Sequence, residues 1–387
     1  METARSKQAG LNDVVLAKVD RKIIANRLHV EQTVARMRRE EEYRQDFFAF
    51  VGKSVKDSAI NFIPIDNNVQ LTIPGQHFRL HKHAVRQIGS RFKISGDYLT
   101  RLTFGEGWQQ ELASVTLNYH FHNGPDDKLL VRGVEGQIRG VLSDKYKRLN
   151  SLMIFDGFIG ETAKYGAVVW DAYMSDTKIW FETINPRPIV LNTEMNGQVV
   201  VFIGARLSSS DYGDGAVEMR TFVLNGICLN GMVQETTISK RHLGSKLGAD
   251  FAFSERTYKL DTLTIMSALS DLTKDLFDPA NIRARCREIE AACSIEVDFN
   301  HEIERLVKAA HISKEEGEQI GGILMLSKPD DGLYGGPSLW KLTQSVSAFA
   351  RDAEPVRKRE LETLTGDMLR SRVLNIEDPV STKLLNE

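Results

Sequence analysis

The stretch LLVRGVEGQIRGVL, residues 129–142, alternates between two kinds of side chain on either side of a glycine-containing turn, Gly133–Gly136. One face of this stretch holds the aliphatic side chains of Leu129, Val131, Ile138 and Leu142. The other face holds Leu130, Arg132, Gln137 and Arg139. A period of two on both sides of such a turn predicts a β-hairpin.

Two further pairs of alternating segments follow this hairpin. YGAVVWDAYM (165–174) and KIWFETI (178–184) form the first pair, and QVVVFIGARL (198–207) and AVEMRTFVLN (216–225) form the second, across the polar loop SSSDYGDG (208–215). Three successive hairpins predict an antiparallel sheet with one face in the core and the other open to solvent or ligand. A flexible hairpin tip is the preferred interpretation of the loop, although Asp211 and Asp214 could bind a cation weakly.

A helical period of 3.6 returns after about residue 255, for example at Ile265, Leu269, Leu272 and Leu276. We therefore predict an α+β protein in which an antiparallel sheet of successive hairpins is backed by helices and followed by a helical C-terminal domain. The predicted divisions are a helical arm (1–58), an α+β domain (59–235), a helical domain (236–376) and a flexible tail (377–387).

Length and composition exclude several classes of protein. The chain has 387 residues, enough for two or three domains, and its 50 basic and 52 acidic side chains nearly balance. That balance argues against a uniformly basic nucleic-acid coat. No apolar run approaches the ~20 residues needed to span a bilayer. The first residues, METARSKQAGLND, contain no apolar signal segment, so we expect a cytoplasmic protein without a membrane partner.

The charges are unevenly distributed along the chain. Residues 68–150 carry 12 basic and 7 acidic side chains, whereas residues 250–387 carry 18 and 25. The positive excess therefore lies around the first hairpin, and the C-terminal third is acidic. Such an asymmetry can mark an anion-binding face.

A cluster of cations surrounds the first hairpin. Arg132 and Arg139 are predicted to share its non-aliphatic face, and four residues directly after it extend the cluster: Lys145, Tyr146, Lys147 and Arg148. A second concentration consists of Lys82, Arg86, Arg91 and Lys93. Arginines on an open sheet face, continued by cations and a tyrosine, can neutralise phosphates and stack a base. The alternative is solubilising charge together with ion pairs to the acidic helical third.

The remaining polar motifs do not form a visible reaction centre. The His81/His83 and His120/His122 pairs lie in or beside predicted helices, where residues two apart diverge, so no metal site is predicted. Cys286 and Cys293 lie on an apolar helical stripe, which predicts two buried thiols. Cys228 has no identifiable partner base. We predict neither a cofactor nor catalytic residues and leave enzymatic activity open.

The order of three segments resembles a phage- and plasmid-borne family, the domain of unknown function numbered 932. The segments are LLVRGVEGQIRGVLSDKYKRLNSLMIF, SSSDYGDGAVEMRTFVLNGICLNGM and GGPSLWKLTQSVSAFARD, within residues 60–352. The family's motif positions fall on Arg132, Arg139, Ser143 to Leu149, Arg220, Cys228, Asn230, Gly231 and Trp340. The resemblance implies a mobile-element context and no particular reaction.

The sequence is compatible with three functions. The first is a mobile-element nucleic-acid-binding protein that favours single-stranded DNA, with a role in annealing or recombination, because such binding needs phosphate neutralisation and stacking but no catalytic residues. The second is a non-enzymatic protein-binding factor, such as a host-defence antagonist, that docks through the acidic helical third. The third is a hydrolase or nuclease with scattered ligands. The sequence also leaves a homo-oligomer open.

Overall fold

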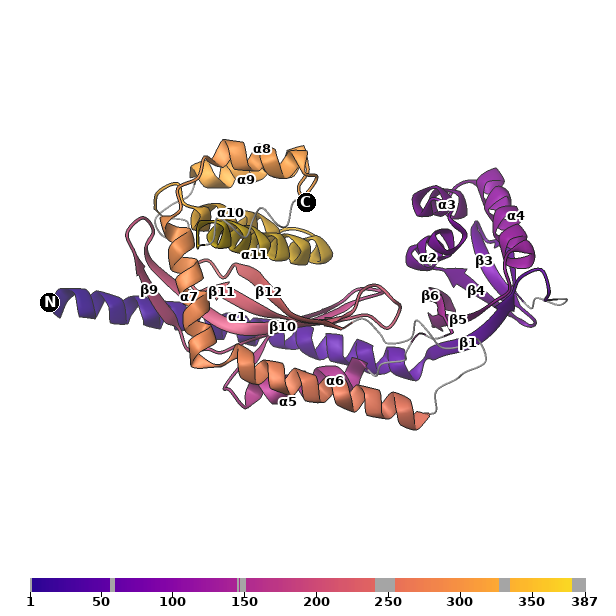
Figure 1. Ribbon diagram of the computed structural model, residues 1–387, viewed down its shortest axis with the longest axis horizontal. Helices are drawn as coiled ribbons and strands as arrows, with labels where there is room; N and C mark the ends of the chain where they lie inside the picture. The colour runs from indigo at the N-terminus through magenta and orange to yellow at the C-terminus, as the bar shows by residue number, and fades with distance from the viewer. Residues whose placement is uncertain are drawn as a thin grey trace.

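The computed structural model describes residues 2–55, 60–144, 146, 151–240, 255–326 and 335–377. Within these residues the chain forms 11 helices and 12 strands, and the strands lie in two six-stranded sheets. The predicted α+β class, with hairpin-built sheets backed by helices and a helical C-terminal region, is confirmed. Figure 1 shows that each sheet belongs to a separate lobe and that helix α1 connects the two.

The small lobe is built on the sheet with strand order β1-β5-β6-β4-β3-β2. Its strands are β1 (Arg44–Val51), β2 (Asn61–Ile65), β3 (Asn68–Ile73), β4 (Gln76–Leu80), β5 (Asp127–Val134) and β6 (Gln137–Ser143). Its helices are α2 (Lys82–Phe92), α3 (Gly96–Thr103) and α4 (Gly107–Asn123). The aliphatic face of the β5–β6 hairpin contributes Leu129, Val131 and Ile138 to the core beneath these helices.

Local chemistry explains two of the small-lobe turns. Asp66 and Asn67 join β2 to β3 with φ of 49° and 59°, and Glu135 and Gly136 join β5 to β6 with φ of 50° and 74°. Two consecutive positive φ values are the signature of the two-residue hairpin turn whose twist matches that of the strands. The hairpin predicted for residues 129–142 is therefore present at its predicted position.

The large lobe is built on the sheet with strand order β12-β11-β10-β8-β7, and β9 pairs with the first part of β10. Its strands are β7 (Val168–Met174), β8 (Ile179–Ile184), β9 (Ile189–Thr193), β10 (Gly197–Ser209), β11 (Val217–Asn225) and β12 (Gly231–Lys240). Helices α5 (Ser151–Ala163) and α6 (Glu255–Leu276) cover one face of this sheet, and α10 (Leu339–Arg351) and α11 (Pro355–Glu377) lie on the other (Figure 1). The remaining helices are α7 (Pro279–Ser294), α8 (Phe299–Lys308) and α9 (Lys314–Leu326).

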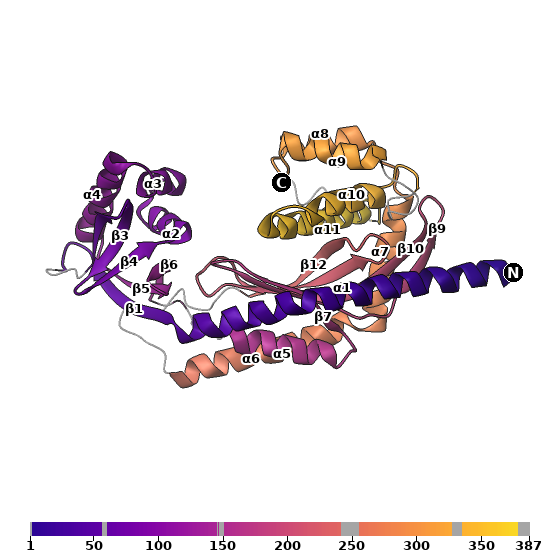
Figure 2. The same ribbon diagram turned by 180° about the vertical axis from the view of Figure 1, so that it is seen from behind.

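Helix α1 (Glu2–Glu42) runs along β7 and ends where β1 of the small lobe begins, as Figure 2 shows from behind. The predicted helical arm therefore stops early, because residues 44–51 form a strand that pairs with β5 along its whole length. Pairing with a distant strand decided the conformation of this segment, and no local helical period could reveal that partner. No helix in the described part of the chain is long and apolar enough to cross a bilayer.

The strands of the predicted 59–235 domain do not share one sheet. The 129–142 hairpin lies in the small-lobe sheet, whereas the hairpins of residues 165–225 lie in the large-lobe sheet. The small-lobe sheet also contains one parallel contact, between β4 and β6. Alternation along a strand reports which side chains are buried, but it does not identify the neighbouring strand.

Candidate functional site

The large-lobe sheet has two chemically different faces. Side chains such as Phe181, Leu207 and Met219 belong to the main apolar core on the α5 and α6 side. On each strand, the residues next to these core residues point to the opposite face of the sheet, because successive side chains of a strand leave it on opposite sides. That opposite face is apolar at one end, around Phe202 and Phe222, and charged at the other.

Cross-strand register places the charged residues in a row. Asp171 on β7 lies opposite Glu182 on β8, Glu182 lies opposite Arg206 on β10, and Arg206 lies opposite Arg220 on β11. Directly opposite residues have Cβ atoms ~5 Å apart, so each side chain can contact the next. The row crosses four strands of the sheet.

Helix α11 covers part of this row and adds a second set of charges. Arg206 Nη2 lies 2.7 Å from Glu182 Oε1 and also donates to Glu362 of α11. Arg359 of α11 lies 3.5 Å from Asp171 Oδ2. Glu182, Arg206, Arg359 and Glu362 are all nearly or fully buried. Burial alone would raise the pKa of Glu182, but the guanidiniums of Arg206 and Arg359 hold that pKa below its usual range.

Three donors in this network have no hydrogen-bond partner among the described residues. They are Nε and Nη1 of Arg206 and Nε of Arg359, and both arginines are almost completely buried. An unsatisfied buried donor is costly unless water or a ligand accepts from it. Arg206 thus presents unused hydrogen-bonding capacity at the floor of the site.

A second cross-strand row lies beside the first and contains two aromatic residues. Tyr173, Trp180, Ser208 and Glu218 are successive partners across β7, β8, β10 and β11. The Arg359 guanidinium carbon lies 4.7 Å from the Tyr173 ring centre and 5.5 Å from that of Trp180. Lys178 Nζ lies 5.5 Å from the Trp180 ring centre. These are cation–π distances, so positive charge lies against both rings.

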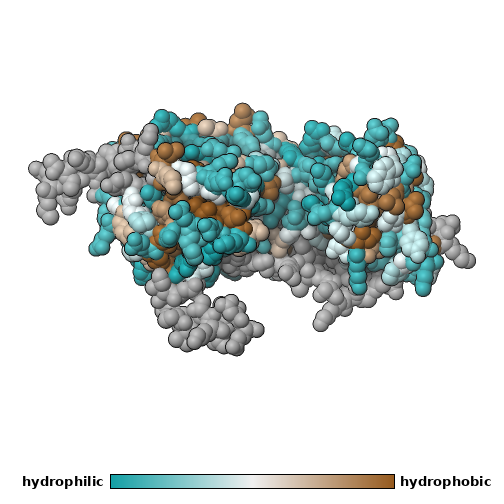
Figure 3. Space-filling view, turned by 90° about the horizontal axis from the view of Figure 1, so that it is seen from above, coloured by the Kyte–Doolittle hydropathy of each residue, from teal (hydrophilic) through white to brown (hydrophobic). Residues whose placement is uncertain are grey.

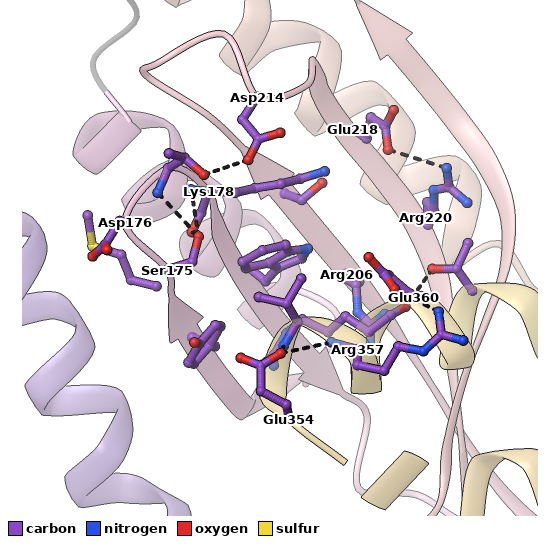
Figure 4. A pocket seen from close by; sticks show the side chains of 18 of the residues that line it. Ser175, Asp176, Lys178, Arg206, Asp214, Glu218, Arg220, Glu354, Arg357 and Glu360 are labelled. Atoms are coloured by element: carbon purple, nitrogen blue, oxygen red, sulfur yellow. Dashed lines mark hydrogen bonds and ion pairs between the residues drawn. The ribbon is translucent and has the colours of Figure 1, made fainter. Parts of the chain in front are cut away.

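The second row, together with Arg206 and Arg220 of the first, forms the floor of a cleft of about 960 Å³. The first turns of α11, the turn between β7 and β8 and the loop before α9 form its walls. Figure 4 shows side chains of α11 and of the β7–β8 turn around the opening. His81, which caps α2 of the small lobe, also lines the cleft, so the cleft reaches the boundary between the lobes. A cleft of this size is typical of a binding site.

The cations of the cleft differ in how strongly they are already paired. Arg357 bonds to Glu316 and Glu360, and Arg36 bonds to Asp176. Lys178 has no carboxylate partner among the described residues. Arg220 meets Glu218 at 3.3 Å with a partly exposed side chain. Lys178 and Arg220 are therefore the cations with most capacity for an added anion.

The predicted phosphate track on the first hairpin is wrong, because its two arginines are buried. Arg132 has an exposed fraction of 0% and bonds to both carboxylate oxygens of Asp46 at 3.0 Å. Arg139 donates to Glu40 of α1 at 2.8 Å and to the Asp176 carbonyl at 3.2 Å. The two arginines do share a face, but the large lobe and α1 cover that face. The alternative prediction, that these arginines form ion pairs, is therefore correct for the interaction but wrong for the partners, which do not lie in the acidic helical third.

The residues that follow the hairpin give no open surface either. The Tyr146 hydroxyl donates to the Ser210 carbonyl at 2.9 Å, and burial raises the pKa of this phenol. Tyr146 therefore packs against the β10–β11 loop, which contradicts its predicted role in stacking a base. Lys145, Lys147 and Arg148 lie outside the described residues.

The β10–β11 loop, Ser208–Gly215, locks the lobes together instead of forming a flexible tip. The Tyr212 carbonyl accepts from His83 and Gln87 of α2 at 3.0 and 2.8 Å. Asp211 accepts from Arg44 and Ser151, and its carbonyl accepts from Arg132. The loop is polar because its side chains and carbonyls satisfy buried groups of the small lobe.

The second predicted cation cluster lies on or next to α2 and remains partly available. Arg91 pairs with Asp127, and Arg86 pairs with Asp97 at 3.1 Å on the surface. Lys82, Arg86 and Lys93 are exposed. Lys82 directly follows His81 in sequence, but neither Lys82 nor Arg86 lines the cleft. Among the predicted site residues, those at the start of α2 are the closest in sequence to a residue that lines the cleft.

The prediction of two buried thiols is right for Cys293 and wrong for Cys286. The described residues contain no cluster of three histidine, cysteine or carboxylate side chains that could hold a metal. Cys293 is buried, as predicted, and burial raises its pKa to about 12, whereas Cys286 is only half-buried. Cys228 lies 3.9 Å from the Gln344 side-chain oxygen, in a turn that packs on α10.

The sequence contains a signal for the cleft. Four segments of the large-lobe sheet, in β7, β8, β10 and β11, carry a charged residue within an apolar run: Asp171, Glu182, Arg206 and Arg220. Charged residues are almost never fully buried without partners, so four of them at matching positions of neighbouring strands predict a buried ionic row. Of these four residues, Arg220 alone falls on a motif position of the family that the chain resembles.

Comparisons with protein-family models, with curated proteins and with solved structures find no match to this chain. The resemblance to the family numbered 932 therefore stays a prediction.

Proposed function

We propose that this protein binds single-stranded nucleic acid in the large-lobe cleft, as a non-catalytic component of a mobile element. The observation that carries the proposal is the cleft floor, where Tyr173 and Trp180 lie in a row next to Lys178 and Arg359. Single strands are bound by such combinations, because bases stack on aromatic rings while cations follow the backbone. The mobile-element context rests on the family resemblance alone.

The number of cations available for phosphates determines how strongly the proposed binding should depend on salt. In the cleft, Lys178 has no carboxylate partner among the described residues, and Arg220 contacts Glu218 at 3.3 Å with a partly exposed side chain. On α2, Lys82 is exposed and Arg86 pairs with Asp97 only at the surface. These four cations are the ones assigned to phosphates. Each phosphate contact to a single strand adds about 0.7 to the magnitude of the log–log salt slope, so four contacts give a slope of about −2.8. A highly basic strand-coating protein would show a much steeper dependence.

The test is the binding of a fluorescently labelled single-stranded oligonucleotide, followed by anisotropy at several salt concentrations. Lys178→Ala is expected to reduce the magnitude of the salt slope by about 0.7. Lys164→Ala is the matched control, because Lys164 is an exposed lysine directly after α5, across the sheet from the cleft. Tyr173→Leu is expected to weaken binding by roughly 1–3 kcal/mol with no change in slope, because it removes a ring and no charge.

Two results would overturn the proposal. The first is the absence of saturable binding to single strands at low salt. The second is binding that Lys178→Ala, Arg220→Ala and Tyr173→Leu all leave at the wild-type level while circular dichroism shows an intact fold, because a strand would then lie elsewhere.

A further inference from the structure

Helix α4 presents an apolar stripe to solvent on the outer side of the small lobe. Trp108, Leu112, Val115 and Tyr119 are 64%, 41%, 66% and 63% exposed. Figure 3 shows hydrophobic side chains reaching the surface of this lobe among hydrophilic ones. Scattered exposed apolar residues are ordinary, but four in one line on one helix are typical of an interaction site.

The opposite side of α4 already packs on the small-lobe sheet. Ala113, Leu117 and Phe121 are fully buried there. The helix is therefore apolar on two sides, a pattern typical of a helix that is covered all round. The chain itself covers one side, so a partner is needed for the other.

The spacing of the stripe is what selects the partner. Steps of four, three and four residues are those of a two-helix seam, in which side chains of one helix fit between those of the other. The same steps read identically from either end. A twofold axis between residues 113 and 114 would therefore bring Trp108 against Tyr119 of a second copy, and Leu112 against Val115 of that copy.

Charge along α4 also fits an antiparallel pair. Glu106 and Glu111 lie at the start of the helix and His120 and His122 near its end. In an antiparallel arrangement the acidic end of each helix lies over the histidine-bearing end of the other, and the two helix dipoles oppose each other. A Trp or Tyr side chain buries ~150–250 Å², so the two stripes supply a contact on the order of 1,000 Å², the size of a weak specific interface.

We propose that this face of α4 is a homodimer interface, in which α4 packs antiparallel on α4 of a second copy. The inference is independent of nucleic-acid binding, because α4 contributes no residue to the cleft. The twofold relation makes the contact self-complementary and closed, so it forms dimers and not open filaments.

The first test is sedimentation of the full chain over a range of concentrations. Wild type is expected to show a reversible monomer–dimer equilibrium. Val115→Glu is expected to raise its dissociation constant at least about tenfold, because it places a charge in the centre of the contact. Ile24→Glu is the matched control, because Ile24 is a β-branched residue 72% exposed on α1. A monomeric wild type, or equal effects of the two variants, would overturn the proposal.

The second test fixes the register with single cysteines under mild oxidation. Trp108→Cys and Tyr119→Cys chains are expected to cross-link when mixed, whereas neither should cross-link to itself beyond the wild-type background. Two copies of position 108 lie about 16 Å apart along the helix axis in this arrangement. Self-cross-linking of either variant would reject the antiparallel register, and a dimer with no cross-link in the mixture would place the interface elsewhere. Circular dichroism of each variant confirms that the fold is intact.

Discussion

Arg132 and Asp46 form a bidentate pair between neighbouring strands β5 and β1, with both donor–acceptor distances at 3.0 Å and the arginine completely buried. Arg132→Ala is expected to lower the free energy of unfolding by about 3–5 kcal/mol, because it removes two charge-assisted hydrogen bonds from the Asp46 carboxylate. Chemical denaturation measures this loss. Arg132→Met combined with Asp46→Leu should lose less than the sum of the two single changes, and strict additivity would contradict the pairing.

The exposed cations at the start of α2 are expected to act on binding and not on stability. Lys82→Ala with Arg86→Ala should reduce the magnitude of the salt slope for single-stranded DNA by about 1.4, because two phosphate contacts are removed. The control is Lys164→Ala with Lys274→Ala, two exposed lysines across the sheet from the cleft, one directly after α5 and one on α6. Equal slopes for both double variants would confine the strand to the large lobe.

His81 makes stability depend on pH near neutrality. Burial lowers the pKa of His81 from 6.5, and the neighbouring Asp176 opposes this only in part. Below pH 6.5 the unfolded chain therefore binds a proton that the folded chain resists, so stability is complete above pH 6.5 and falls as the pH drops through that value. His81→Asn keeps an N-cap acceptor for His83 and should flatten the curve between pH 7 and the lower pKa. Thermal melts of both proteins across this pH range measure the pH dependence of stability. The same dependence in wild type and variant would exclude His81 as its source.

The thiols are expected to react in order of accessibility. Burial raises the pKa of Cys293 to about 12 and also raises that of Cys286. The thiolate is the reactive species, so Cys293 should stay unlabelled by a thiol reagent at pH 8 until the chain unfolds, and Cys286 should react slowly. Mass spectrometry of digested, labelled protein assigns each site, and early labelling of Cys293 would contradict its burial.

Two helical glycines should respond oppositely to alanine. A Cβ at Gly366 of α11 would lie 1.7 Å from the Val233 carbonyl oxygen, so Gly366→Ala must push α11 away from β12 and should cost about 1–3 kcal/mol or more. At Gly160 of α5 nothing lies within 4 Å of an added Cβ, so Gly160→Ala should stabilise by roughly 0.5–1 kcal/mol. Denaturant midpoints compare the two, and an equal shift in the same direction would show that α11 does not approach β12 so closely.

The amino-acid sequence determined the local elements of this protein. Alternation predicted the β5–β6 hairpin and the strands β7, β8, β10 and β11, and the return of a 3.6 period predicted the C-terminal helices. These features depend on near neighbours in the chain, so a period and a turn residue suffice. Burial of Cys293 followed from the same periodicity.

Tertiary structure alone decided which strands share a sheet and which charges face solvent. Arg132 and Arg139 carry the sequence signature of an open cationic face, but α1 and the Ser208–Gly215 loop cover it with carboxylates and carbonyls from more than 70 residues away. The cleft likewise exists because register aligns Glu182, Arg206 and Arg220 and α11 closes over them. Alternation places a side chain on a face, whereas only packing determines what lies opposite that face.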